Sequence, residues 1–261
     1  MIVWCAYCQA FIREIPPYDD PSLSHGICAS CVARVEHDDT LVEQTEGVRQ
    51  LMHRLLAGAS RRDRATCDAL LTEARTLGLR ADSLLVGLLQ PALYQAGRDW
   101  QGGRMSVAAE HWLTSWCEDA FASVPTVNPG SSLDLIIFQT PGNSHSLGPR
   151  FAAKILTARG LSVEAFVPEL PLGEMAALVI DLEPRAVGFS CSLPDSVPVA
   201  CDIIAKLQAR SEPAFRCRYI VSGHAFRMGG GHARPAVGAG IDVAMDVVAL
   251  ADELLAGKRT R

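Results

Sequence analysis

Hydrophobic residues in the C-terminal half of the chain gather in short runs that alternate with segments of helical periodicity. Five runs rich in β-branched residues predict strands, at residues 133–139, 162–167, 186–191, 219–221 and 241–244. Segments of helical spacing separate or follow them, at residues 151–159, 173–182, 197–210 and 247–255. Because the run 133–139 is almost wholly apolar, it is typical of a parallel strand buried on both faces. The alternation predicts an α/β domain with a doubly wound, five-stranded parallel sheet, which binds ligands at the carboxyl ends of its strands.

The middle of the chain, residues 40–124, carries apolar residues at the three- and four-residue spacing of amphipathic helices. Four such stripes begin at Val48, Cys67, Leu84 and Val107. Short charged or glycine-containing breaks separate them, so this segment is expected to fold as a four-helix bundle.

The first 36 residues differ from both of these regions, with four cysteines, three prolines and few aliphatic residues. A loop rich in Pro, Gly and Ser, PTVNPGSS at residues 125–132, separates the helical pattern from the α/β pattern. We therefore expect three parts: residues 1–36, a helical bundle at 40–124 and an α/β domain at 131–261.

The charge balance argues against long polyanions as ligands. Lys and Arg number 24 and Asp and Glu 29, which gives a formal net charge of -5. Aromatic residues make up 6% of the chain. Both values disfavour direct nucleic-acid binding, which relies on a basic surface and on aromatic side chains that stack on bases.

The sequence predicts neither a membrane span nor a secretory signal. The longest uncharged helical stretch, residues 83–97, has 15 residues and contains Pro91, whereas a bilayer requires about 20. The start, MIVWCAYC, lacks the basic residues and apolar core of a secretory signal. With nine cysteines and no export signal, a cytoplasmic protein is expected, in which clustered cysteines bind metal more often than they form disulfides.

Two pairs of cysteines lie close to the start of the chain, Cys5 with Cys8 and Cys28 with Cys31. Each pair has the spacing of a zinc knuckle, and four thiolates complete a tetrahedral structural zinc site. His25 lies nearby, as a replacement ligand or a hydrogen-bond partner of a thiolate. The stretch WCAYC…SHGICASC resembles the zinc-ribbon-like modules found beside bacterial signalling domains. The alternative is two reduced pairs that hold no metal.

Small and polar residues follow three of the predicted strands. They are Asn143, His145 and Gly148 after the first strand, Ser190 and Ser192 at the third, and Ser222 and Gly223 at the fourth. Because the carboxyl ends of parallel strands meet at one edge of a sheet, these residues are expected to form a groove. His145 is the candidate metal ligand of that groove, and the alternative is a solvated loop histidine.

A second group of candidate residues lies on the predicted bundle. Trp100 comes just before the break Gly102-Gly103, and Glu110 and His111 lie on the next helix. A large flat ring and two polar groups are thus expected to face one region of the bundle. The alternative is a tryptophan that fills the core and a Glu–His pair that is merely solvated.

The groove residues resemble the cobalamin (vitamin B12)-binding domain of corrinoid-dependent methyltransferases, mutases and light-sensing repressors. In that family the first loop reads Asp-x-His-x-x-Gly, the second Ser-x-Leu and the third Gly-Gly. The resemblance implies that His145 is the lower ligand of cobalt. It also implies a channel for the displaced nucleotide tail, lined by Gly148, Ser190, Ser192, Ser222 and Gly223.

Three positions depart from the family pattern. Asn143 stands where the family has Asp, Ser192 where it has Leu, and Ser222 where it has the first Gly. An amide oxygen still accepts a hydrogen bond from the distal ring nitrogen of His145. Because the amide adds no negative charge, the imidazole is expected to be a weaker electron donor.

The order Trp, nine residues, Glu-His, on a bundle directly before such a domain, resembles the light-sensing cobalamin-dependent repressors. There the bundle caps the upper face of cobalt. The resemblance implies that Trp100 packs on the upper ligand and that Glu110 hydrogen-bonds it. His111 either binds cobalt after that ligand is lost or supports the pocket. Corrinoid methyl carriers share the bundle but generally lack this set.

The sequence therefore predicts a cobalamin-binding signalling protein with a zinc module, a four-helix cap and a flavodoxin-like domain. Adenosyl- or methylcobalamin is the expected cofactor, and light sensing rather than an enzymatic reaction is the expected activity. Loss of the upper ligand would change a contact with a protein partner or a second copy of the chain.

Any role in transcription regulation is expected to pass through such a partner. The light-sensing repressors carry a DNA-binding domain ahead of the bundle, and 36 residues without basic character are too few for one. Three alternatives remain open: a methyl carrier of a corrinoid methyltransferase system, a light-independent cobalamin store, and a groove that holds no cofactor.

Overall fold

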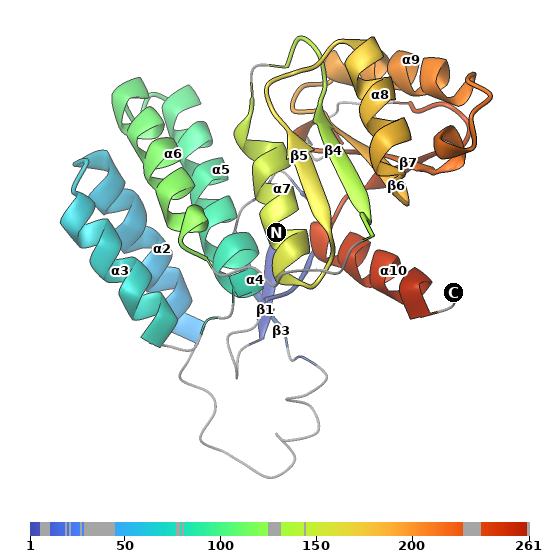
Figure 1. The fold of residues 1–261 in the computed structure, drawn as a ribbon. Helices are drawn as coiled ribbons and strands as arrows, with labels where there is room; N and C mark the ends of the chain where they lie inside the picture. Colours follow the sequence, from blue (N-terminus) through green and yellow to red (C-terminus); the bar gives the residue numbers. More distant parts are fainter. Residues whose placement is uncertain are drawn as a thin grey trace. The chain divides into compact units, whose positions relative to one another are not determined.

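The structure is a computed structural model of the chain (Figure 1). It describes residues 1–5, 11–18, 20, 22–26, 28, 45–76, 79, 81–124, 132–143, 145–226 and 236–259. The chain divides into two compact units, Met1–Pro125 and Thr126–Arg261. Among the described residues, no helix combines the length and the apolar character needed to span a bilayer.

Three short strands open the first unit: β1 (Ile2–Cys5), β2 (Phe11–Glu14) and β3 (Leu23–Gly26). β1 lies in the middle of the sheet, antiparallel to β2 and parallel to β3. These strands are not predicted from the sequence, because runs of four residues carry too little alternation to be recognised. The sheet therefore adds a structured element to the cysteine-rich segment.

Helices follow in the described part of the first unit (Figure 1). They are α2 (Thr45–Ser60), α3 (Arg64–Thr76), α4 (Ala81–Leu84), the π-helical η2 (Leu85–Leu89), α5 (Gln90–Gln101) and α6 (Val107–Ala122). α4, η2 and α5 follow one another without a gap, so residues 81–101 form one continuous helix. Leu55, Leu89 and Leu113, from three of these elements, are fully buried.

The second unit contains the five-stranded parallel sheet that the sequence predicts. Its strands are β4 (Leu135–Gln139), β5 (Val163–Phe166), β6 (Ala186–Ser190), β7 (Arg218–Ser222) and β8 (Ile241–Ala244). All neighbouring strands are parallel, in the order β5-β4-β6-β7-β8. The predicted α/β fold is therefore confirmed.

Helices cover both faces of this sheet (Figure 1). They are α7 (Leu147–Ala158), α8 (Leu172–Leu182), α9 (Ser196–Gln208) and α10 (Val247–Arg259), with short 3-10 turns η3 (Pro213–Arg216) and η4 (His224–Phe226). Leu135 and Ile137 of β4 pack in one core with α7 and α10. Ile136 and Phe138 pack in the other core with α8 and α9. The alternation along β4 thus buries the strand on both faces.

A buried ion pair lies at the amino ends of the strands. The Asp134 carboxylate, fully buried, is 3.0 Å from Nη1 of Arg185 and accepts a hydrogen bond from the backbone N–H of Ser162 at 2.8 Å. Arg185 also donates to the carbonyl of Leu254 on α10. The pair therefore joins the starts of β4, β5 and β6 to α10.

Candidate functional site

The predicted groove residues lie where the direction of the sheet's connections changes. β5 lies on one side of β4 and β6 on the other. The segments that leave the carboxyl ends of β4 and β6 therefore run to opposite sides, and such a switch point is the usual ligand position in sheets of this kind. Asn143 and His145 follow β4, and Ser190 and Ser192 end and follow β6.

The loop after β4 is held in a tight turn. Gly142 has φ +78°, a left-handed conformation that favours glycine. The backbone N–H of Asn143 donates to the carbonyl of Thr140 at 3.1 Å. Glu169, from the segment after β5, accepts a hydrogen bond from the N–H of Gly142. Sequence reasoning missed Glu169, because nothing in its local sequence marks a contact with a residue 27 positions earlier.

The Asn143 side chain connects His145 to the end of β6. Asn143 is 3% exposed. Its Nδ2 donates to the Ser190 carbonyl and to Oγ of Ser192, each at 3.2 Å. Its Oδ1 accepts from the backbone N–H of His145 at 3.1 Å and lies 3.2 Å from Nδ1 of the ring. Four of the predicted groove residues are thus brought together by one buried amide.

The orientation of this amide selects the tautomer of the neutral His145 ring that fits the contact. A carbonyl oxygen only accepts, so the Ser190 carbonyl requires the NH2 group of Asn143 to face it. The amide oxygen then faces the ring, and Nδ1 must carry the proton in that contact. In the neutral ring the lone pair is left on Nε2 of His145, which lies on an exposed side chain. An imidazole nitrogen of this kind is a metal ligand.

Gly148 and Gly223 lie near the ends of the neighbouring strands, and the space around each glycine differs. A Cβ at Gly148 would lie 3.4 Å from Oγ of Ser190, which is close to ordinary contact. A Cβ at Gly223 would lie 2.2 Å from the carbonyl oxygen of Cys191, and Gly223 has φ +124°. Close backbone packing therefore requires glycine at 223. Oγ of Ser222 donates to the carbonyl of Ala244 at 2.7 Å.

Two further buried residues lie beside this network. Gln139, which ends β4, donates through Nε2 to the carbonyl of Asn143, and its Oε1 has no hydrogen-bond partner among the described residues. Burial raises the pKa of the Cys191 thiol, which lies 3.5 Å from Oγ1 of Thr140. Gln139 was missed at the sequence level, although a polar residue that closes an apolar strand is a usable signal.

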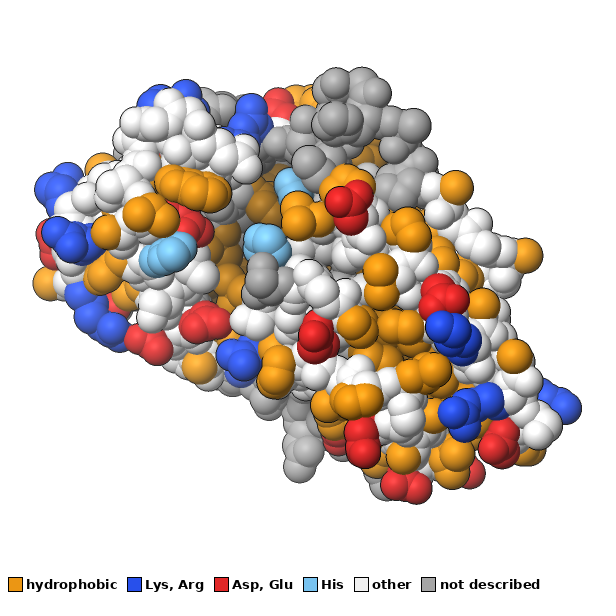
Figure 2. Space-filling model, turned by 90° about the horizontal axis from the view of Figure 1, so that it is seen from above, with side chains coloured by type: hydrophobic (Ala, Val, Ile, Leu, Met, Phe, Trp, Pro, Cys, Tyr) orange, Lys and Arg blue, Asp and Glu red, His pale blue; other side chains and the backbone are white. Residues whose placement is uncertain are grey.

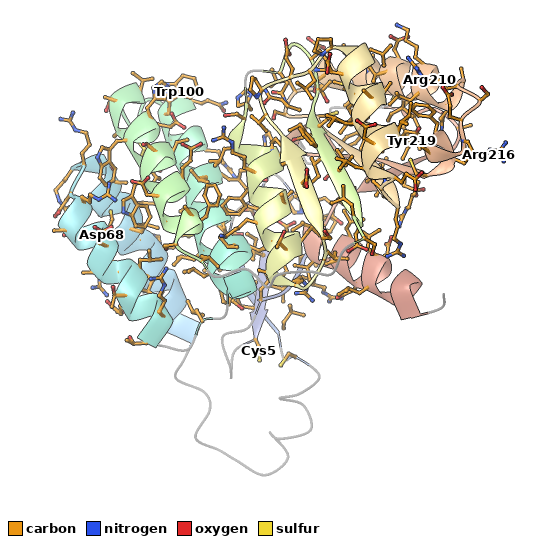
Figure 3. All side chains as sticks on the ribbon, viewed as in Figure 1. Cys5, Asp68, Trp100, Arg210, Arg216 and Tyr219 are labelled. Carbon is orange, nitrogen blue, oxygen red and sulfur yellow. The ribbon has the colours of Figure 1, made fainter. Side chains whose placement is uncertain are left out.

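The predicted bundle residues lie around the turn between α5 and α6. Trp100 is 47% exposed and lies at one end of α5 (Figure 3). Oγ of Ser106 accepts from the N–H of Ala109, which begins α6 and places Glu110 in its first turn. Thr114 donates to Glu110 at 3.1 Å, and His111 Nε2 lies 3.5 Å from the other carboxylate oxygen. Because the Trp100 ring is exposed, it does not fill the core as the alternative interpretation expected.

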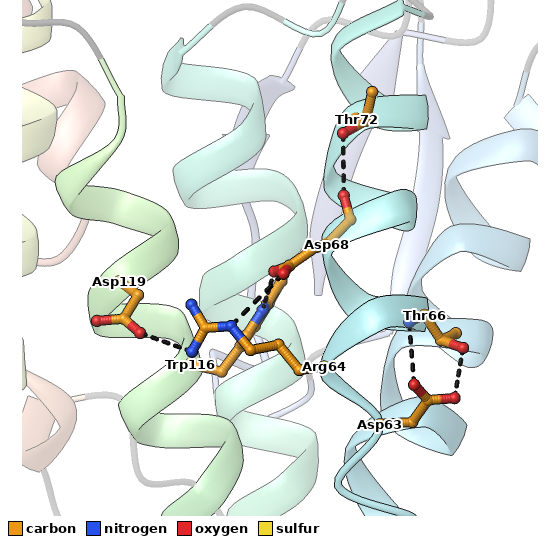
Figure 4. Close-up of polar contacts among 7 residues, drawn as sticks. All are labelled: Asp63, Arg64, Thr66, Asp68, Thr72, Trp116 and Asp119. Atoms are coloured by element: carbon orange, nitrogen blue, oxygen red, sulfur yellow. Dashed lines mark hydrogen bonds and ion pairs between the residues drawn. The ribbon is translucent and has the colours of Figure 1, made fainter.

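A polar network fixes α6 against α3 (Figure 4). Nε1 of Trp116 donates to Asp68 at 2.8 Å. Arg64 lies 3.5 Å from the same carboxylate of Asp68 and 3.0 Å from Asp119 on α6. These contacts fix the C-terminal half of α6 against α3, and Glu110 lies earlier on the same helix.

Only part of the predicted zinc site lies among the described residues. The backbone N–H of Cys28 donates to Sγ of Cys5 at 3.5 Å, so one cysteine of each pair lies beside the other. Cys8, Cys31 and the side chain of His25 lie outside the described residues. Within the described part of the chain, no group of three or more metal-ligating side chains is found.

The visible face of the molecule in Figure 2 carries no broad field of one charge. Basic and acidic side chains of the described residues are interspersed there with hydrophobic ones. Trp100, Val107 and Leu193 are among the large hydrophobic residues exposed in the structure, each at 47–49%. The first two belong to the α5–α6 turn and the third to the end of β6.

Residues 51–124, which hold most of α2 and continue through α6, match the sequence profile of the B12 binding domain family. This match supports cobalamin binding. The fold is similar to that of the monomethylamine corrinoid protein of Methanosarcina barkeri, with a TM-score of 0.60 and 12% identity over 80% of this chain and 98% of that one.

Two other solved structures are similar at lower scores. One is a cobalamin-binding protein of Desulfitobacterium hafniense, with a TM-score of 0.38 and 14% identity over 80% of this chain and 97% of that one. The other is the methanol:cobalamin methyltransferase complex of Methanosarcina barkeri, with a TM-score of 0.37 and 14% identity over 89% of this chain and 94% of that one. A comparison with curated protein sequences found no match.

Proposed function

We propose that this protein binds cobalamin, with His145 as the lower ligand of cobalt. The observation that carries this proposal is the contact between Oδ1 of Asn143 and Nδ1 of His145 at 3.2 Å. It leaves the lone pair of the ring on Nε2 of an exposed side chain at the switch point of the sheet. The family match of residues 51–124 supports the same cofactor independently.

The residues around His145 fit such a cofactor. The absence of a side chain at Gly148 leaves room beside Oγ of Ser190, which a nucleotide tail would use. Ser190 and Ser192 accept hydrogen bonds from the Asn143 amide. They would therefore line the channel and also hold Asn143 in place beside His145. Ser222 and Gly223 would close the channel at the end of β7.

The residues that orient the His145 ring also determine how strongly its imidazole donates electrons to a metal. Because Asn143 is neutral, it orients His145 without adding negative charge to the imidazole. Ser192, which replaces the family's Leu, supplies an acceptor for the amide of Asn143. These two departures from the family pattern therefore belong together: an Asp at 143 would instead face the Ser190 carbonyl with an oxygen.

The proposed activity is light sensing. A bound alkylcobalamin would supply a cobalt–carbon bond that light breaks. Trp100, exposed at the end of α5, would pack on the upper ligand, and Glu110, held by Thr114, would hydrogen-bond it. His111 would support this pocket or replace the lost ligand. The two forms of the cofactor would contact the bundle differently, and a contact with a partner or a second copy would change.

The second candidate is a methyl carrier in a corrinoid methyltransferase system. The likeness in fold to a methylamine corrinoid protein favours it. Trp100 and the Glu110–His111 pair argue for the sensor, because a carrier must leave its upper face open to partner active sites. A light-independent cobalamin store is the third candidate.

We further propose that Cys5, Cys8, Cys28 and Cys31 bind one zinc ion. The hydrogen bond from the Cys28 N–H to Sγ of Cys5 supports it, because backbone N–H groups commonly stabilise metal-bound thiolates. The site would be structural, since four thiolates leave no open position for a substrate.

The binding proposal is tested by an absorption spectrum. Protein incubated in the dark with adenosyl- or methylcobalamin and then desalted is expected to retain the cofactor. His145→Ala should weaken retention at least about tenfold, as loss of a metal-site residue does. His53→Ala, an exposed histidine on α2, is the matched control. Equal retention and an unchanged spectrum in His145→Ala would refute the ligand assignment.

The sensing proposal is tested on the loaded protein by illumination. We expect a stable protein-held photoproduct and a change in size or association measured by size-exclusion chromatography. Trp100→Ala should retain the cofactor and lose this change, whereas Val107→Ala, which is equally exposed, should keep it. A loaded protein whose size does not respond to light would favour the carrier or the store, and methyl transfer to an acceptor thiol would then separate those two.

A further inference from the structure

Residues 140–143 form a β-turn shortly before His145. The backbone N–H of Asn143 donates to the carbonyl of Thr140 at 3.1 Å, which is the hydrogen bond that closes such a turn. Pro141 occupies the first central position, and Gly142, with φ +78°, occupies the second. Because the ring of proline fixes its φ at a negative value, this combination defines a type II turn. The conformation of the turn determines the direction in which the chain continues to His145.

Glu169 contacts the peptide group that distinguishes this turn from its commonest alternative. Type I and type II turns differ mainly by a flip of the central peptide, which here joins Pro141 to Gly142. The N–H of that peptide belongs to Gly142 and donates to the carboxylate of Glu169, an exposed residue after β5. In a type I turn the same N–H would point away from the carboxylate. The hydrogen bond therefore favours the type II turn over the type I turn.

Gln139 holds the other end of the turn from the interior. Gln139 and Asn143 are 4% and 3% exposed, and Nε2 of Gln139 donates to the carbonyl of Asn143. Because that carbonyl only accepts, the NH2 group of Gln139 must face it. Oε1 of Gln139 then has no hydrogen-bond partner among the described residues. A buried acceptor without a partner costs free energy, so stability alone does not explain a glutamine here.

The two contacts hold one short segment from the two sides of β4. Glu169 follows β5, which lies on one side of β4, and Gln139 pairs with Ser190 of β6 on the other. Asn143, fixed at its backbone in this way, directs Oδ1 to the N–H and to Nδ1 of His145. The position of the His145 ring is therefore determined by the turn as well as by the Asn143 amide.

We propose that Gln139 and Glu169 are positioning residues that hold the turn, and through Asn143 the His145 ring, in the position that binds cobalt. This inference rests on the proposed function. Both residues act through the loop rather than on the cofactor. A loop that is ordered in advance loses less conformational entropy when the ligand binds. Without either contact, His145 samples other positions, and a smaller share of the bound cofactor is coordinated by it.

The first measurement uses the full chain without cobalamin. Hydrogen exchange of residues 139–147 is followed by mass spectrometry, with α9 as an internal reference. Gln139→Met keeps the length of the side chain and removes the donor to a buried carbonyl, so exchange should become about tenfold faster. Glu169→Ala should speed exchange by less, about threefold, because water competes for a hydrogen bond between exposed groups.

The second measurement loads the same variants with methylcobalamin in the dark. Gln139→Met and Glu169→Ala should retain less cofactor, and their absorption spectra should show a smaller share with His145 on cobalt. Glu169→Gln keeps an oxygen that accepts from the N–H of Gly142, so it should restore the exchange rate and the spectrum of the parent. Glu164→Ala, which removes an exposed carboxylate of β5, is the matched control and should also behave as the parent.

The outcomes separate this inference from the proposed function. A parent chain that retains no cobalamin, or retains it equally as His145→Ala, would overturn both. Retention that depends on His145, with parent-like exchange and spectra in Gln139→Met and Glu169→Ala, would overturn the positioning role alone. Glu169→Gln as impaired as Glu169→Ala would show that the hydrogen bond to Gly142 is not the cause, and would overturn the role of Glu169.

Discussion

The two ends of the five-stranded sheet hold polar groups in opposite ways. At the amino ends, Asp134 and Arg185 form a charged pair, closed off between three strands and α10. At the carboxyl ends, Asn143 holds His145 through neutral hydrogen bonds and leaves the ring exposed. The first arrangement joins the starts of β4, β5 and β6 to one helix. The second leaves the lone pair on Nε2 of the neutral His145 ring exposed, where it can bind a metal.

The largest expected effect lies at the amino ends. Asp134→Ala leaves the partly buried guanidinium of Arg185 without its carboxylate, which should lower the free energy of unfolding by about 3 kcal/mol. Urea denaturation measures this loss. Asp252→Ala, which removes an exposed partner of Arg159, should cost less than about 1 kcal/mol. Equal losses in the two variants would contradict a special role for the buried pair.

The next effect tests close packing at the carboxyl ends. Gly223→Ala adds a Cβ against the backbone of Cys191 in a left-handed conformation, so a loss of about 2–3 kcal/mol is expected. Gly142→Ala has a positive φ as well, but nothing lies within 4 Å of the new atom. It should cost only the conformational part, about 1 kcal/mol. Thermal unfolding of both variants separates the clash from the strain, and a Gly142→Ala variant as unstable as Gly223→Ala would remove the distinction.

A smaller loss of stability is expected when the neutral Asn143 beside His145 is replaced by a carboxylate. Asn143→Asp replaces the Nδ2 donor by an oxygen that faces the Ser190 carbonyl, which should destabilise the fold by about 1–2 kcal/mol. The carboxylate would at the same time make His145 a stronger donor to a metal. Denaturation gives the first quantity, and the absorption spectrum of the cobalamin-loaded variant tests the second. A variant as stable as the parent would mean that the amide orientation is unimportant.

The smallest effect concerns Ser192. Ser192→Ala removes one of the two acceptors of the Asn143 amide while the Ser190 carbonyl remains, so a loss of about 0.5–1 kcal/mol is expected. In the Asn143→Asp background, Ser192→Ala should lower the free energy of unfolding by less, because the amide that donates to Oγ of Ser192 is no longer present. A double-mutant cycle by urea denaturation measures this coupling, and strict additivity would argue that the two departures from the family pattern are unrelated.

The central strands β4 and β6 were predictable because short apolar runs bounded by turn residues are typical of strands buried on both faces. The edge strands β5 and β8 are less buried, and their β-branched residues indicated them. The start of α7 was predicted at residue 151, yet the helix begins at Leu147. Gly148 and Pro149 read as a break in the sequence. Proline is tolerated in a first helical turn, however, because no intrahelical partner is needed there for its missing N–H.

The interactions within the site were predictable only in part. The contact of Asn143 with His145 follows from two residues that are close in sequence. The bonds from Asn143 to Ser190 and Ser192 span 47 and 49 residues, and they depend on the register of β4 against β6. The contact of Trp4 with Gly87 could not be predicted either, because a glycine within a helical segment indicates only weak helix propensity.

The π turn at η2 also determines what an insertion or deletion in this helix would do to the protein. One surplus residue per turn is what a single-codon insertion into a regular helix leaves behind. A deletion in the stretch Leu85–Leu89 would restore an ordinary helix, but it would move Gly87, on which a Cβ would lie 1.7 Å from the Trp4 ring, and re-aim Trp100 in the same event. A single deletion of three nucleotides would therefore change both the contact of Trp4 with Gly87 and the direction of Trp100.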